Sequence, residues 1–339
     1  MNLEETYQKI KPAIVAFVPK FHPVYDPKEP LPEFPPIFGT GFIIADGLVV
    51  TNDHVAKQIN KLPRPKDCPP ELWPVNCLLL YFIHDKGMAE IHIDVLGVFG
   101  IQKMDTGKAY YGPPKPDIAF VHIKMKDLPT AKVHYDKDKI KEGCEVATAG
   151  FPMGTATLTA PGYLHQLTPT LQRGIISAVL PFECDRPHAL MINVMTQGGA
   201  SGSPVFSPDS DEVIGVLYGG LIDKQTTLVK VPKNKKEIDP SLHAHYYKSP
   251  TNISYVVPSY YIEKMLPNIV KDKNLEASKD LPSLNDVIKN AQFVVRERGK
   301  KREHKIWRQE EMPVERKLKE IEPGKQDRSE SGGDNNVTA

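Results

Sequence analysis

The residue best placed for nucleophilic chemistry is Ser201, in the segment QGGASGSPVF at residues 197–206. Glycines before and after the serine favour a tight loop that exposes its hydroxyl. Such a loop also leaves backbone N–H groups free to bind an oxygen that gains negative charge during a reaction. The segment alone is weak evidence, since Gly- and Ser-rich turns are common in loops. A nucleophilic serine also needs a base and an acid.

Two earlier segments contain a base and an acid. His54 lies in TNDHVA at residues 51–56, and Asp117 lies in PDIAFV at residues 116–121. A histidine can take the proton of the serine, and an aspartate can hold the imidazole in the tautomer that this requires. The chain order of histidine, aspartate and serine is that of chymotrypsin-like triads. Together these residues predict acyl transfer through a covalent serine intermediate.

Further motifs extend this pattern over most of the chain. The segments GTGFII, DG and TNDH between residues 39 and 54 resemble the histidine region of HtrA-like (Deg) trypsin-fold serine proteases. GFPMG, RGIISA, EVIGV and YVVPS follow at residues 150–259 in the order of that family, so the resemblance spans roughly residues 8–266. It implies an all-β, chymotrypsin-like fold of two six-stranded antiparallel β-barrels, and a serine endopeptidase that hydrolyses peptide bonds through an acyl-enzyme.

The resemblance also implies a role for each residue of the site. His54 is the general base, Asp117 is the acid that orients it, and Ser201 is the nucleophile. The backbone N–H groups of Gly199 and Ser201 then form the oxyanion hole.

Two neighbouring residues are alternatives to these assignments. Asp53 could replace Asp117 as the acid, but its side chain leaves the backbone beside His54, so we interpret it as structural. Ser203 could replace Ser201 as the nucleophile, but the family position favours Ser201. Ser203 stands where the family usually has glycine, which is tolerable only if this residue does not need a positive φ.

Four residues are expected from the resemblance to shape the substrate pocket. Met195, six residues before Ser201, occupies the position that often forms the pocket base. An apolar side chain there argues against lysine or arginine before the scissile bond. Tyr218, Gly219 and Gly220 match the segment that pairs with the substrate backbone, and the glycines leave room at the entrance. We expect cleavage after apolar residues of small to medium size.

The residue before the serine bears on activation. Secreted trypsin-like enzymes order their oxyanion loop with an aspartate at this position, which pairs with an N-terminus freed by cleavage. Here the position holds Ala200, which has no carboxylate, and no Arg-Ile-Val-Gly-Gly-type cleavage site lies upstream. We therefore expect that no N-terminal cleavage is needed, and that the oxyanion loop is ordered by the protein body, by substrate or by a partner.

Short apolar segments separated by turns predict the strands of the two barrels. Pro-rich segments at residues 19–36 and 63–74 favour surface loops, and the polar segment 124–141 is expected to cross between the barrels. A long, lysine-rich polar insertion is expected at residues 223–252, and a closing helix at residues 259–266. The expected strands are residues 13–18, 39–44, 48–51, 77–83, 91–99, 117–121, 145–149, 174–180, 189–194, 204–206, 213–218 and 253–257.

The pattern divides the chain into four parts. Residues 8–125 and 126–266 are the two barrels, residues 267–310 are a helical extension, and residues 311–339 are a charged, disordered tail. HtrA-like proteins often carry a peptide-binding PDZ domain after the protease, but the residues beyond 266 are too few and too polar for one. Ser283 can cap a helix that docks on the protease body through its apolar residues Leu284, Val287, Ile288, Ala291, Val294 and Val295.

The composition is that of an ordinary soluble globular protein: 339 residues, 40% hydrophobic, 25% charged, with a net charge of +1. No signal peptide is visible, and no apolar run approaches the roughly 18 residues of a spanning helix. The four cysteines form no CxxC pair, and Val55 stands where secreted trypsins usually carry a cysteine. We expect a cytoplasmic protein with reduced thiols, a polypeptide substrate and no membrane partner.

No cofactor and no metal are expected, because His243 and His245 lack a nearby acid or third ligand. The basic segment 296–308 is interpreted as a solvated helix end rather than a nucleic-acid contact. Two other functions stay open at this point. One is a catalytically silent binding protein on a protease fold, and the other is a nucleic-acid-associated protease that uses the basic segment. The oligomeric state is also open.

Overall fold

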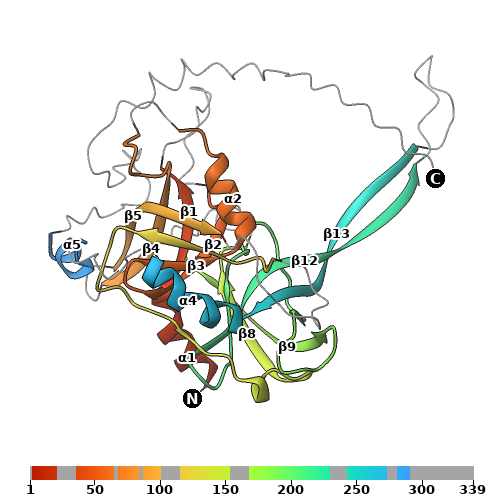
Figure 1. The fold of residues 1–339 in the computed structure, drawn as a ribbon. Coiled ribbons are helices and arrows are strands. Elements are labelled where there is room, and N and C mark those ends of the chain that lie inside the picture. Colours follow the sequence, from red (N-terminus) through yellow and green to blue (C-terminus); the bar gives the residue numbers. More distant parts are fainter. Residues whose placement is uncertain are drawn as a thin grey trace, which may run out of the picture.

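The computed structural model describes residues 2–20, 36–64, 68–83, 87–100, 115–152, 168–229, 243–272 and 281–290. Two β-barrels lie next to each other, and helices flank them (Figure 1). The first barrel is closed, with its strands in the order β1-β2-β3-β6-β5-β4. These strands are β1 (Ile14–Pro19), β2 (Gly39–Ala45), β3 (Leu48–Thr51), β4 (Val75–Ile83), β5 (Gly87–Gly100) and β6 (Ala119–Ile123). The predicted first barrel is confirmed.

The hairpin of β2 and β3 shows how the sequence sets this barrel. Asp46 and Gly47 form its turn, and Gly47 has a φ of 70°, a conformation that glycine adopts without strain. Phe42 pairs with Val50 across the hairpin. Every residue of β3 is buried, which fits its continuous run of apolar and β-branched side chains. The hairpin therefore ends with the chain directed toward His54.

The second barrel is a ring of six strands in the order β11-β8-β9-β10-β13-β12, which a β11–β12 pairing closes. It confirms the expected pair of barrels. A short strand β7 (Lys132–Val133) adds to β12 in parallel, from within the segment that joins the barrels. The six strands are β8 (Glu145–Gly150), β9 (Thr170–Leu180), β10 (Ala189–Ile192), β11 (Pro204–Phe206), β12 (Glu212–Val229) and β13 (His243–Pro258).

The expected polar insertion at residues 223–252 is wrong in part, because β12 and β13 continue into it. Their antiparallel pairing runs from Gly215↔Pro258 to Val229↔His243. The resulting two-stranded arm extends away from the rest of the barrel (Figure 1). Polar strands carry no apolar alternation, so the backbone pairing in this segment left no hydrophobic period to recognise.

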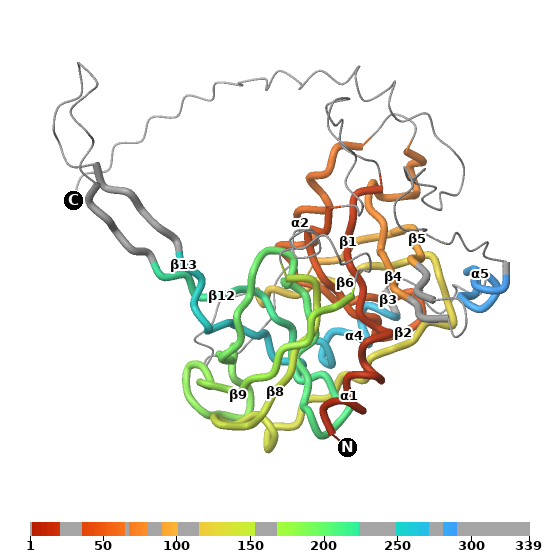
Figure 2. The backbone as a smooth tube through the Cα atoms, turned by 180° about the vertical axis from the view of Figure 1, so that it is seen from behind, coloured from red at the N-terminus to blue at the C-terminus, as the bar shows by residue number. Residues whose placement is uncertain are grey.

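The larger hydrophobic core joins the two barrels. It contains Phe17, Phe42 and Phe120 of the first barrel together with Phe206 of the second. A separate, smaller core fills the interior of the second barrel around Ile192 and other buried residues. Seen from behind, the strands of the two barrels again lie next to each other (Figure 2). Residues that come from both barrels can therefore meet at their junction.

The helices differ from expectation in three places. Helices α1 (Leu3–Ile10) and α2 (Asp53–Lys61) were not predicted. Buried Val55, Ala56 and Ile59 give α2 an apolar side at helical spacing, a signal that the sequence does contain. The closing helix α4 (Tyr260–Asp272) is longer than the expected 259–266 and continues past Pro267.

Helix α5 (Leu284–Asn290) docks on the body, as predicted for the helix after Ser283. The Lys126 N–H donates to the Pro282 carbonyl at 3.0 Å, and the Leu284 N–H donates to the Lys126 carbonyl at 3.0 Å. Leu284 is buried in the larger core. The predicted continuation to Val295 and the tail lie outside the described residues. The division of the chain at residues 125 and 126 stays a prediction.

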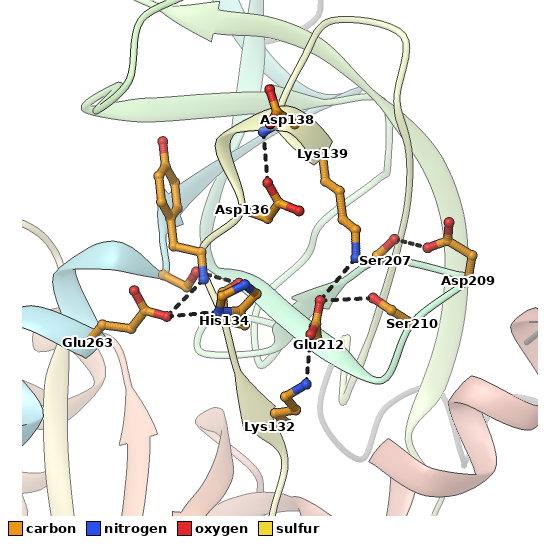
Figure 3. A network of polar contacts seen from close by, with 12 residues as sticks. Lys132, His134, Asp136, Asp138, Lys139, Ser207, Asp209, Ser210, Glu212 and Glu263 are labelled. Carbon is orange, nitrogen blue, oxygen red and sulfur yellow. Dashed lines mark hydrogen bonds and ion pairs between the residues drawn. The ribbon is translucent and has the colours of Figure 1, made fainter.

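The segment between the barrels is tied to the second barrel by a polar network (Figure 3). The carboxylate of Glu212 on β12 accepts from Lys132 Nζ at 2.7 Å and from Lys139 Nζ at 3.1 Å. Lys139 ends the short 3₁₀ helix Lys137–Lys139. Farther along, the Tyr135 N–H donates to a carboxylate oxygen of Glu263 on α4 at 2.9 Å.

All four cysteines are unpaired. In the part of the chain that the structure describes, no helix is long and apolar enough to cross a membrane.

Candidate active site

The pairing of β3 with β6 brings His54 and Asp117 together. Thr51 at the end of β3 pairs with Ala119 at the start of β6. His54 lies just beyond β3 in the first turn of α2, and Asp117 lies just before β6. The His54 ring Nδ1 is 2.6 Å from Asp117 Oδ2, and the His54 backbone N–H donates to Oδ1 at 3.0 Å. One carboxylate thus holds both the ring and the backbone of this histidine.

Asn52 is a supporting residue that the sequence reasoning missed. It precedes α2 and is completely buried. Its side-chain amide donates to the backbone carbonyl of Asp117 at 2.8 Å. The loop that carries the carboxylate is therefore fixed through its backbone as well as through His54. Its position inside TNDH, two residues before the histidine, was the available signal.

Asp53 has different partners, although it is the residue next to His54. Its carboxylate lies 2.8 Å from Lys57 Nζ and 2.8 Å from Lys115 Nζ, and its side chain is 9% exposed. Burial alone would raise the pKa of Asp53, but the hydrogen bonds and charges of the two lysines outweigh it and lower this pKa. Asp53 ties α2 to the segment before Asp117, which fits the structural interpretation.

The Ser201 loop connects β10 to β11 and requires two of its glycines. Gly199 has a φ of 94° and Gly202 a φ of 91°, values that favour glycine. A Cβ atom on Gly202 would lie 1.9 Å from the Thr40 carbonyl oxygen and 2.5 Å from Thr51 Oγ1. The loop is therefore packed directly against the strands of the first barrel that lead to the histidine.

Thr40 of β2 makes the bonds that join this loop to the first barrel. Its backbone N–H donates to the Ser201 carbonyl at 2.8 Å. Its hydroxyl donates to the Gly199 carbonyl at 2.6 Å. Sequence reasoning gave Thr40 no role, and its only signal was its place between two glycines in GTGFII.

In the part of the chain that the structure describes, three donors of this loop have no protein acceptor. Among the contacts of the described residues, neither the N–H of Gly199, nor the N–H of Ser201, nor the Ser201 hydroxyl makes a hydrogen bond. The two N–H groups can therefore receive a substrate oxygen. The structure joins His54 to Asp117 but does not join Ser201 to His54 by a hydrogen bond. Such bonds are often long in enzymes without substrate and tighten when substrate binds.

Ser203 is buried and already bonded. It is 1% exposed, and its hydroxyl donates to the Ala200 carbonyl at 2.6 Å. Its φ is not positive, so it meets the condition under which a serine can replace the usual glycine. A buried hydroxyl with a bound acceptor is a poor nucleophile, which favours Ser201 on geometric grounds.

The four expected pocket residues differ in their exposure and in the space around them. Met195 is 40% exposed, and Tyr218 stacks on Tyr255 with ring centroids 5.7 Å apart. Among the described residues, nothing lies within 4 Å of a Cβ atom built on Gly219, so this glycine borders open space. One on Gly220 would lie 2.5 Å from the Thr196 hydroxyl, so Gly220 does not face open space.

Thr196 is a further residue that sequence reasoning missed. It is 9% exposed, and its hydroxyl lies 3.0 Å from the hydroxyl of buried Ser254. Ser254 in turn donates to the Val194 carbonyl at 2.6 Å. These two hydroxyls are therefore satisfied by the protein, and the apolar Met195 next to them stays accessible.

A metal centre has no support in the described part of the chain. There, no three His, Cys, Asp or Glu side chains gather as ligands of a metal ion. The side chains of His243 and His245 lie outside this description.

Comparison with known proteins identifies the family. A family model of the trypsin-like peptidase domain matches residues 39–216, more than half of the chain. The chain therefore belongs to the trypsin-like peptidase family. The matched range includes His54, Asp117 and Ser201.

Several solved HtrA-type structures are similar to the chain at low identity. A tripeptide complex of the HtrA-type protease AlgW is 16% identical with a TM-score of 0.43, and covers 80% of this chain and 65% of that chain. A decapeptide complex of an AlgW variant is 16% identical with a TM-score of 0.44, and covers 80% and 67%. Deg5 is 15% identical with a TM-score of 0.44, and covers 79% and 93%. The chain thus spans 64–65% of the length of two AlgW chains. No curated protein sequence matches it significantly.

Proposed function

We propose that the chain is a serine endopeptidase that uses Ser201, His54 and Asp117. The observation that carries the proposal is the double contact of Asp117 with His54, at 2.6 Å to the ring and 3.0 Å to the backbone. A carboxylate on Nδ1 leaves Nε2 of the ring free to accept a proton. The N–H groups of Gly199 and Ser201, which find no acceptor among the described residues, support the same hypothesis.

The reaction follows from these groups. Ser201 Oγ attacks the peptide carbonyl and passes its proton to His54 Nε2. The N–H groups of Gly199 and Ser201 hold the resulting oxyanion, and each such donor is worth roughly 2.7–4 kcal/mol in the transition state. His54 then protonates the leaving amine, and the acyl-enzyme forms. Water, deprotonated by His54, then attacks the acyl carbonyl, and His54 returns this proton to Ser201 Oγ as the acid leaves. Asp117 stays ionised throughout and keeps the ring oriented.

The test is covalent labelling with a serine-directed fluorophosphonate probe. The wild-type protein should become labelled, with the adduct on Ser201 in a peptide map, and Ser201→Ala should not. Ser203→Ala is the matched control, because Ser203 lies in the same loop but is buried and bonded to Ala200. It should still label. An unlabelled wild-type protein would instead favour a catalytically silent protease-fold protein, and an adduct on Ser203 would move the nucleophile.

The proposed preference is for apolar residues before the scissile bond. The half-exposed thioether side chain of Met195 and the open space at Gly219 support it, since neither offers a charge to lysine or arginine. Incubation with a peptide library followed by mass spectrometry of the products would identify the cleaved bonds. Cleavage mainly after lysine or arginine would contradict this preference without affecting the proposed mechanism.

A further inference from the structure

We propose that Thr40 is a positioning residue that holds the oxyanion-binding loop in its active geometry. The inference rests on the proposed function and adds a residue to it. Thr40 lies on β2 of the first barrel, whereas the loop belongs to the second. The first barrel would then hold the oxyanion hole of the second barrel in shape, in addition to supplying the base and the acid.

The contacts of Thr40 use every polar group that it has. Its N–H donates to the Ser201 carbonyl at 2.8 Å, and its own carbonyl accepts from Thr51 Oγ1 at 2.7 Å. Its hydroxyl donates to the Gly199 carbonyl at 2.6 Å and accepts from the Phe151 N–H at 3.1 Å. Thr40 is completely buried. Its hydroxyl is therefore held in one orientation, with its proton directed at Gly199.

These contacts fall on the two residues that matter for the oxyanion. Gly199 and Ser201 each have an N–H group that finds no acceptor among the described residues, and Thr40 binds the carbonyl of each. The peptide plane that follows Gly199 is fixed at both ends, because the Ala200 N–H donates to the Gln197 carbonyl at 3.1 Å. A glycine at a φ of 94° would otherwise have several alternative conformations. Thr40 restricts it to one.

This arrangement offers a way to order the oxyanion-binding loop that does not need an aspartate before Ser201. Ala200 has no carboxylate with which a freed N-terminus could pair to order the loop. The Thr40 hydroxyl supplies an internal tether at the residue next to Ala200. The loop is then ordered by the folded body, without a cleavage event.

The experiment compares Thr40→Val, Thr40→Ser and a matched control. Valine keeps the shape but removes the hydroxyl, which leaves the Gly199 carbonyl and the Phe151 N–H without this partner. Serine keeps the hydroxyl. Thr148→Val is the control, because buried Thr148 on β8 donates to the Pro204 carbonyl at 2.9 Å, on the other side of the nucleophile. It removes a similar bond to a carbonyl that does not belong to the oxyanion residues.

The measurements are the rate constant of fluorophosphonate labelling, the Tm, and hydrogen exchange of residues 197–203. Thr40→Val should label roughly 10² times more slowly or worse, since losing one oxyanion donor already costs about that much. It should also exchange faster over this segment. Thr40→Ser should recover most of the rate. Thr148→Val should label at the wild-type rate despite a comparable fall in Tm.

Three outcomes would overturn the inference. One is wild-type labelling and exchange in Thr40→Val, and another is a loss in Thr40→Ser as large as in Thr40→Val. The third is an equal loss in Thr148→Val, which would indicate general destabilisation. If the wild-type protein itself is not labelled, the proposed function fails, and hydrogen exchange alone still decides whether Thr40 orders the loop.

Discussion

The two halves of the candidate site are held in different ways. His54 and Asp117 both follow from the pairing of β3 with β6 inside the first barrel, and their side chains contact each other directly. Ser201 comes from the second barrel and is braced by Thr40 of the first. One half is thus internal to a barrel, whereas the other spans the junction between the barrels.

This difference indicates which half depends on the docking of the barrels. The His54–Asp117 contact needs only the register of one antiparallel pair. In the Ser201 loop, the carbonyls of Gly199 and Ser201 bond to Thr40 of β2, so we expect this loop to be the more sensitive of the two to loosening of the junction. We therefore expect that His54 and Asp117 can stay in contact while the Ser201 loop changes its shape.

The first prediction removes the ionic contact between His54 and Asp117, the half of the site that lies within the first barrel. Asp117→Asn should lower kcat by about 10⁴, because an amide in place of the carboxylate favours the wrong tautomer of His54. The Tm should stay close to that of the wild-type protein, since asparagine has the same shape and can still accept from the His54 N–H. Steady-state kinetics on a peptide that the wild-type protein cleaves would measure the effect. Near-normal activity here, together with lost activity in Asp53→Asn, would make Asp53 the acid.

The second prediction tests whether Asp53, beside His54, stabilises the fold rather than taking part in catalysis. Asp53→Asn removes the carboxylate between Lys57 and Lys115, and a buried polar partner lost in this way costs about 1–3 kcal/mol. Because both lysines are partly exposed, the lower end of this range applies. The Tm should fall, while kcat of the folded protein stays far above that of Asp117→Asn.

Lys57→Gln is the matched control for Asp53→Asn. It removes only the contact with the more exposed lysine, whose side chain is 63% exposed, and should cost less than Asp53→Asn. Thermal unfolding followed by circular dichroism measures all three proteins. An equal Tm for Asp53→Asn and the wild-type protein would show that this carboxylate does not stabilise the fold.

The internal half was also the easier one to predict from the sequence. His54 and Asp117 lie in short motifs beside strands, and the family resemblance pointed to both of them. The contact itself joins residues 63 apart, but the strand register brings them together without further information. The two barrels followed in the same way, from short apolar runs and turn residues.

The contacts between Thr40 and the Ser201 loop, which cross from one barrel to the other, could not be predicted from any local pattern. The Thr40 hydroxyl bonds to a carbonyl 159 residues away, and a threonine in a strand is ordinary by itself. The arm of β12 and β13 was missed for a related reason, since its pairing was extended through polar residues. Helix α2 was a different kind of error, because Val55, Ala56 and Ile59 already carried a helical period.

The last prediction uses acid to weaken the attachment of the segment between the barrels to the second barrel. The hydrogen bond from Lys132, together with that from Lys139, lowers the pKa of Glu212 from 4.5 to about 2. These bonds outweigh burial, which alone would raise this pKa. A lowered carboxyl pKa gives stability that is fully present above pH 4.5 and is lost as the pH falls toward 2.

Glu212→Gln cannot ionise, so its Tm should lie below that of the wild-type protein at pH 6, and the difference should shrink between pH 4.5 and 3. This carboxylate ties the segment between the barrels to β12, so the loss of stability reports on that attachment. A Tm difference that stays constant from pH 6 to pH 3 would mean that the charge of Glu212 contributes nothing to this attachment.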